Sequence, residues 1–370
     1  MGQLISLLTI LFFFNTSAYA QWSLNDVSYL VPLTRIQMVS ELLPLNEILP
    51  MSLINQFPRL DPRHTQDEIL KKTAIVSLRL EPQKKRLRFV WQPVFFYSAG
   101  PSALDVALHS HHEFSVENYN ELLNDLKKLK TKTATTTQLS ALDTNPIFIN
   151  ESDSKAFLNL IKNYLKKAKL VELTAMALRG ANNMWVFMGF KINSIDQFDP
   201  IQIPRTQNSQ VQRFVNQAIP FKFYDSSEIA PIDYNTKDNL ELFIAKATRI
   251  PTLTEDEARE ALGIAHKFEN PRIFNTDNLD CVSCHIAQSA REWLAINSKQ
   301  IFTTPNVNLY ENKKHNLENR SDEILNTGQI RGFGYFGSNK AISQRVIHDS
   351  AEAADYLNMI QSDHSHRSIQ

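Results

Sequence analysis

One short stretch constrains this chain more than any other, NLDCVSCHIAQ at residues 278–288. It holds Cys281, Cys284 and His285 in the spacing C-x-x-C-H, and the chain has no other cysteine. A shuffled chain of the same composition would place two cysteines three apart before a histidine in roughly one case in several thousand. We therefore expect these two thiols and this imidazole to form one functional site.

The first 20 residues predict an export signal. An apolar run from Leu4 to Phe14 is followed by polar residues and by an A-x-A sequence that ends at Ala20. This order is typical of a signal peptide cleaved before Gln21, so we expect a periplasmic or otherwise exported protein. No lysine or arginine precedes the apolar run, and an uncleaved anchor is the alternative. No later segment is apolar for long enough to cross a bilayer, and we expect no transmembrane segment in the mature chain.

The composition is that of an ordinary globular protein. It is 43% hydrophobic and 21% charged, and 370 residues are enough for two domains. Lysine plus arginine number 39, and aspartate plus glutamate also number 39, so no net field attracts nucleic acid or an anionic membrane surface. We expect no nucleic-acid partner.

An exported C-x-x-C pair has several possible roles. The two thiols could form a structural disulfide or a redox dithiol. A thioredoxin-like dithiol starts a helix directly after a strand, whereas residues 270–280 contain Pro271, Asn275 and Asp277 and predict a loop. A zinc site needs four ligands and usually a second paired motif, which this sequence lacks. The full C-x-x-C-H spacing is typical of covalent haem attachment.

Haem chemistry accounts for the spacing. Cys281 and Cys284 would each add to a haem vinyl group as a thioether, because two intervening residues let both sulfurs reach adjacent porphyrin edges from one tight turn. His285 would then lie beneath the iron as its proximal axial ligand. The sequence thus predicts one covalently bound haem c, with the iron held by His285.

On these residues the C-terminal part resembles the c-type cytochromes, class I in particular, over residues 254–360. Thr254 and Glu257 form a capping box before a predicted helix, EDEAREALGIAHKF. A second predicted helix, SAEAADYLNMI, has Ala354, Leu357 and Ile360 on one face. The resemblance implies a mainly α-helical, cytochrome c-like haem domain over residues 251–370, in which these two helices cross and shield a haem edge.

The resemblance also implies a sixth iron ligand, which in this family is usually a methionine in the loop before the last helix. No methionine occurs in residues 286–358, and His348 and Met359 are the candidates that follow the motif. Core packing for Met359 and a solvated helix end for His348 are the simpler interpretations. A ligand from the other domain, or an open sixth position, is equally compatible. Pro305 is a candidate acceptor for the second ring N–H of His285.

Residues 21–250 are numerous enough for their own core, and we expect them to form an α+β domain of unknown function. Two pairs of β-rich runs predict hairpins, TAIVSLRL with RLRFVWQPVFF and LVELTAMALRG with MWVFMGFKI. NYNELLNDLKKLK and SDSKAFLNLIKNYLKKAK have helical periodicity. Hairpins with interspersed helices favour the α+β class.

A histidine cluster, LHSHHEF, is the one chemically suggestive feature of this region. In a strand, His109 and His111 would share a face and could ligate a metal, but the preceding Pro101 and Ser102 favour a polar loop. No phosphate loop, dinucleotide fingerprint or hydrolase motif accompanies them.

Two classes of function compete. The first is an exported mono-haem cytochrome that passes single electrons to a redox partner protein. The second is an enzyme, or a gas or peroxide sensor, whose iron has an open sixth position. Two-haem peroxidases need a second C-x-x-C-H motif, which this sequence lacks. We expect electron transfer rather than catalysis. A haem that only stabilises an interaction module is the third interpretation.

Overall fold

The computed structural model describes residues 21–61, 63–133, 140–142, 144–179, 184–194, 197–215, 229–230, 254–298, 301, 306–320, 330 and 332–367. The predicted signal peptide at residues 1–20, the predicted domain boundary between residues 250 and 251, and Pro305 lie outside the described residues.

The centre of the molecule is an antiparallel sheet. Ten strands of the described residues belong to it, in the order β1-β2-β3-β5-β6-β7-β9-β10, with β4 paired to β3 and β8 paired to β7. They are β1 (Ser28–Leu30), β2 (Thr73–Glu81), β3 (Arg86–Tyr97), β4 (Gly100–Ala103), β5 (Val106–Glu113), β6 (Lys169–Arg179), β7 (Met184–Ser194), β8 (Gln197–Pro200), β9 (Val211–Val215) and β10 (Ile229–Ala230).

Both predicted hairpins are present in this sheet. Strands β2 and β3 pair directly and are joined by a short 3-10 helix at Pro82–Lys84. Lys85 closes this connection in the left-handed region, at φ 52°, which lets the chain reverse. Strands β6 and β7 form the second predicted pair.

Helices surround the sheet. In chain order they are α1 (Leu24–Val27), α2 (Ile36–Leu42), α3 (Leu45–Ile48), α4 (Met51–Ile54), α5 (Gln66–Lys72), α6 (Val116–Thr133), α7 (Glu151–Leu165), α9 (Glu255–Glu269), α10 (Cys281–Asn297) and α11 (Gln344–Arg367). The hydroxyl of Thr254 accepts a hydrogen bond from the backbone N–H of Glu257 in the predicted capping box of α9. The last predicted helix lies inside α11, which starts earlier, at Gln344. Among the described residues, no helix has the length and apolar character that crossing a membrane requires.

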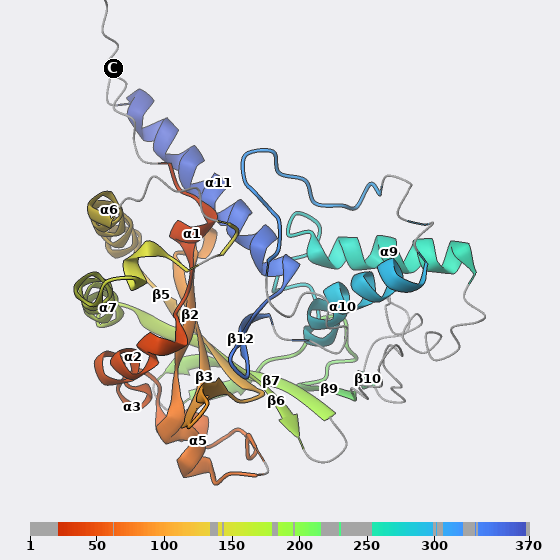
Figure 1. Ribbon diagram of the computed structural model, residues 1–370, viewed down its shortest axis with the longest axis horizontal. Coiled ribbons are helices and arrows are strands. Elements are labelled where there is room, and N and C mark those ends of the chain that lie inside the picture. Colours follow the sequence, from red (N-terminus) through yellow and green to blue (C-terminus); the bar gives the residue numbers. More distant parts are fainter. Residues whose placement is uncertain are drawn as a thin grey trace, which may run out of the picture.

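The two faces of the sheet are covered by different parts of the chain. Figure 1 shows α6 and α7 on one side of the strands and α9 and α10 on the other. On the first side, Phe157 of α7 packs against Tyr29 with ring centroids 4.8 Å apart. On the second side, the C-terminal part contributes helices and a hairpin of β11 (Phe333–Phe336) and β12 (Asn339–Ile342).

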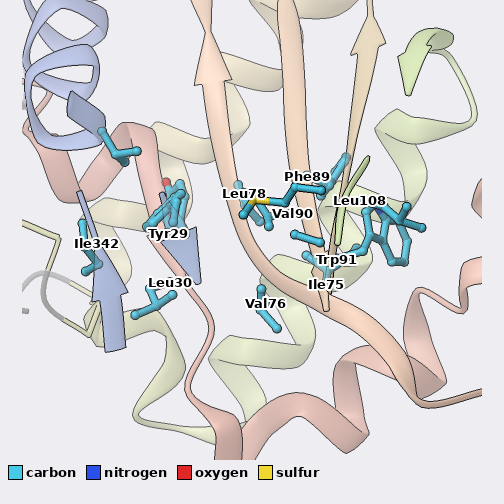
Figure 2. Close-up of a cluster of buried hydrophobic side chains, with 14 of the residues drawn as sticks. Tyr29, Leu30, Ile75, Val76, Leu78, Phe89, Val90, Trp91, Leu108 and Ile342 are labelled. Atoms are coloured by element: carbon cyan, nitrogen blue, oxygen red, sulfur yellow. The ribbon is translucent and has the colours of Figure 1, made fainter. Parts of the chain in front are cut away.

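This C-terminal hairpin is fastened to the sheet by buried hydrogen bonds. The side-chain amide of Gln92 in β3 donates to the carbonyl of Tyr335 and accepts from its N–H, at 3.0 and 2.8 Å. Ser77 in β2 donates to the carbonyl of Phe333 at 2.9 Å. Figure 2 shows Ile342 of β12 in the same apolar cluster as Leu30 and the strands of the sheet. The described N-terminal and C-terminal parts therefore share one hydrophobic core.

Candidate functional site

The C-x-x-C-H motif forms the first turn of α10. Residues 270–280, directly before it, form a loop as predicted. Asp280 is the N-cap, and its carboxylate accepts a hydrogen bond from the N–H of Ser283 at 2.9 Å. Gln212 of β9 donates to the same carboxylate at 2.8 Å and accepts from the N–H of Val282 at 3.0 Å. Both Asp280 and Gln212 are fully buried. A strand of the central sheet thus fixes the turn that carries the motif.

The turn faces a cavity between the sheet and the C-terminal helices. Its empty space is about 1340 Å³, part of it open to solvent, and Cys281, Cys284 and His285 all line it. The opposite wall comes from the sheet and includes Arg88, His109, His111, Glu172, Met176 and Met188. Because this space includes open solvent, the enclosed part of the cavity is smaller than this volume.

His285 is held in one orientation within this cavity. Its Nδ1 donates to the backbone carbonyl of Ile330 at 2.5 Å, so its Nε2 carries no proton when the ring is neutral. Burial lowers the pKa of His285 to about 4, which favours the neutral ring. The sequence indicated Pro305 as a candidate acceptor, and in the structure the carbonyl of Ile330, in the segment before β11, has that role. The ring also lies 5.2 Å from that of Phe187, centroid to centroid.

Cys281 and Cys284 are both unpaired and half-buried. Burial raises the pKa of the Cys281 thiol well above its usual range, and burial also raises the pKa of Cys284. Redox-active dithiols have lowered pKa values because thiolate is the reactive form. These surroundings are therefore those of a shielded thiol pair, and they differ from those of a thioredoxin-like site.

The histidine cluster lies on a strand, and the predicted polar loop at this position is wrong. Residues 109–112 belong to β5, between β3 and β6 in the sheet. His109 and His111 share the face that lines the cavity, while His112 faces the opposite side and stacks edge-on against Phe89. Pro101 belongs to β4, a separate short strand that pairs with β3. The sequence here does not alternate, because three apolar residues are followed by five polar ones, and the strand is instead defined by its pairing with β3 and β6.

Charged side chains on the sheet wall are mostly paired. Arg79 bonds to Asp349 at 2.9 Å and to Glu81 at 3.3 Å, and Arg345 bonds to Asp349 at 3.0 Å. His111 contacts Glu81 at 3.1 Å. Such pairing reduces the cost of burying charge beside the cavity.

Neither predicted sixth ligand lies at the cavity. His348 is only 4% exposed, so the expected solvated helix end is wrong. Its Nδ1 donates to the carbonyl of Glu269, and its Nε2 bonds to the side chain of Gln344. Met359 is 53% exposed on α11. Two methionines that the sequence did not indicate as ligands, Met176 and Met188, line the cavity from β6 and β7.

The cavity residues fit a covalent haem. Two free thiols and an imidazole with a fixed Nδ1–H are the donor set that such a group requires. The Nε atom of Arg88 is fully buried with no hydrogen-bond partner in the described part of the chain, a further sign of a bound group. A bare metal ion is a poorer match, since within the described ranges no three His, Cys, Asp or Glu side chains converge as a metal site.

The chain was also compared with known proteins. Neither a protein-family model, nor a curated protein, nor a solved structure matches it.

Proposed function

We propose that this protein is an exported mono-haem c-type cytochrome that transfers single electrons. One observation supports this more than any other: Cys281, Cys284 and His285 line the same cavity, and a hydrogen bond fixes the orientation of His285. Residues 251–370 would then be a mainly helical, cytochrome c-like domain, as the motif and the helices α9, α10 and α11 suggest. Residues 1–20 would direct export, and a redox protein would be the partner.

Each side chain of the motif has a separate task in this proposal. Cys281 and Cys284 hold the cofactor through thioethers, and the fixed first turn of α10 sets their positions. His285 directs Nε2 to the metal because Ile330 occupies its Nδ1–H. Covalent haem supplies the cycling between Fe(III) and Fe(II). The sheet and the C-terminal helices form the walls of the cavity and would limit the access of water to the cofactor.

The test is whether porphyrin stays attached to the denatured chain. The protein is produced in a bacterium that matures exported c-type cytochromes, extracted with acid acetone, and weighed by mass spectrometry. We expect the colour to stay with the polypeptide and the intact mass to exceed the apoprotein mass by one haem. Cys281→Ser together with Cys284→Ser should lose this added mass, whereas Ser283→Ala, which keeps all three motif residues, should retain it. Extraction of all colour from the parent protein contradicts the proposal.

The second candidate function is an enzyme, or a gas or peroxide sensor, whose iron has an open sixth position, and one observation favours it. Arg88 donates to Nδ1 of His109 at 2.7 Å, which puts the proton of His109 on Nε2 and leaves neither ring nitrogen free to bind a metal. The thioethers of Met176 and Met188 favour the electron carrier instead, because both line the cavity and methionine is a common axial ligand. Carbon monoxide separates the two functions: an unchanged ferrous spectrum supports the carrier, and a shifted one supports the open site.

A further inference from the structure

Arg88 is the one cavity arginine without an acidic partner in the described part of the chain. Arg79 and Arg345 share Asp349, and Arg79 also pairs with Glu81. Arg88 has one hydrogen bond, to His109, and its Nε bonds to nothing among the described residues. The carboxylates of Glu81 and Asp349 attract it only at longer range, without an ion pair. His109 accepts this bond with a neutral ring nitrogen, so it supplies no compensating charge.

An unpaired guanidinium in this position is unfavourable. Arginine does not lose its proton in proteins, so it cannot escape burial by becoming neutral. Strand register places Arg79, a second cation, directly opposite Arg88 on β2. Burying a charge without a close partner of opposite sign is strongly unfavourable. The arrangement therefore favours an anion inside the cavity, in direct contact with Arg88.

The position of Arg88 indicates which anion. It lines the same cavity as Cys284 and His285, on the wall that faces the motif. Haem carries two propionate carboxylates at one edge, and a planar guanidinium is the side chain that best matches a carboxylate. Glu172 lines the same cavity but makes no ion pair with Arg88 in the described structure.

We propose that Arg88, oriented by His109, is the counter-ion of a haem propionate. This inference rests on the proposed function and gives residues 21–250 a role in it: their sheet supplies the cationic wall of the haem site. The residues of the motif belong to the C-terminal part, and Arg88 lies almost 200 positions earlier in the chain.

The experiment measures the midpoint reduction potential of the purified holoprotein. A cation beside the cofactor stabilises the ferrous form, which carries one more electron, so we expect Arg88→Gln to shift the potential to a more negative value. Arg88→Lys keeps the charge and should retain most of the parent potential. Arg86→Gln is the matched control, because Arg86 lies on the same strand but pairs with Glu113 outside the cavity. It should leave the potential unchanged.

Three outcomes would count against the inference or its basis, and they are distinguishable. A parent protein without covalent haem removes the proposed function itself. Covalent haem with equal potentials in the parent and in Arg88→Gln overturns only the role of Arg88. In the third outcome the two proteins have equal potentials without acetate, and added acetate shifts the potential of the parent only. The carboxylate that binds Arg88 then comes from solution, and the propionate assignment is wrong. Far-UV circular dichroism and haem content of each variant verify that it is folded and loaded.

Discussion

Replacing Gln212 by alanine tests whether the sheet holds the motif-bearing turn in place. Gln212 is fully buried in β9, and its amide joins the sheet to the first turn of α10. It donates to the carboxylate of Asp280 at 2.8 Å and accepts from the N–H of Val282 at 3.0 Å. Alanine removes both bonds and leaves the buried Val282 N–H without this acceptor.

The expected loss follows from these two contacts. A hydrogen bond to a charged group contributes about 1.5–3 kcal/mol, and an unsatisfied buried N–H costs about 1–3 kcal/mol. The two losses do not add fully, because they share one side chain and Asp280 keeps its bond from Ser283. We expect the free energy of unfolding to fall by about 3 kcal/mol, which lowers the folding equilibrium constant by about two powers of ten.

Urea unfolding followed by far-UV circular dichroism measures this change, provided that the dependence on urea is equal in both proteins. Gln56→Ala is the control, since the exposed amide of Gln56 donates only to the carbonyl of Ser52. Its effect should stay within about 0.5 kcal/mol. A loss below about 1 kcal/mol for Gln212→Ala would refute the view that this amide fixes the turn.

Two further stability predictions concern the opposite face of the sheet and the last helix. Burial lowers the pKa of His112 to about 3 from 6.5, so the unfolded chain binds the extra proton between these values and stability falls as the pH drops below 6.5. Urea titrations of His112→Asn should therefore show a shallower acid loss than the parent, by up to about 1.4 kcal/mol per pH unit, and parallel curves would contradict this. In α11, Leu357 is fully buried and Met359 is 53% exposed. Thermal unfolding should show a loss of about 2–5 kcal/mol for Leu357→Ala and less than about 0.5 kcal/mol for Met359→Ala, and equal losses would exclude this account of the helix.

Local signals in the sequence were sufficient for several elements, but not for the strand that carries His109 and His111 or for the site. The turn between β2 and β3, the capping box at Thr254 and the loop before Cys281 each depend on a few neighbouring residues, and each is present. The contact between Gln212 and Asp280 joins positions that no local pattern relates. The same holds for the acceptor of His285, where a backbone carbonyl at Ile330 carries no side-chain signal at all.

His348 illustrates a different limit of sequence reasoning. It lies in a polar stretch near a helix start, a pattern that usually indicates solvent exposure. In the structure the carbonyl of Glu269 and the ring of Tyr310 cover it, at 2.7 Å from Nδ1 and 4.5 Å between ring centroids. Its burial depends on how α9 and α11 pack, which the residues around His348 do not specify.

The polar face of the central sheet connects the fold to the proposed site. An antiparallel sheet often leaves one face to water, and the alternation that places Arg79, Arg88 and His111 on one face would normally indicate such a surface. Here the C-terminal helices cover that face, so its charges are desolvated. Asp349 of α11 and Glu81 both pair with Arg79, and Glu81 also contacts His111. No carboxylate of the described residues makes an ion pair with Arg88, and its buried Nε has no hydrogen-bond partner among them. The proposal of an anionic group in the cavity therefore depends on the burial of this polar strand face and not on a sequence motif within it.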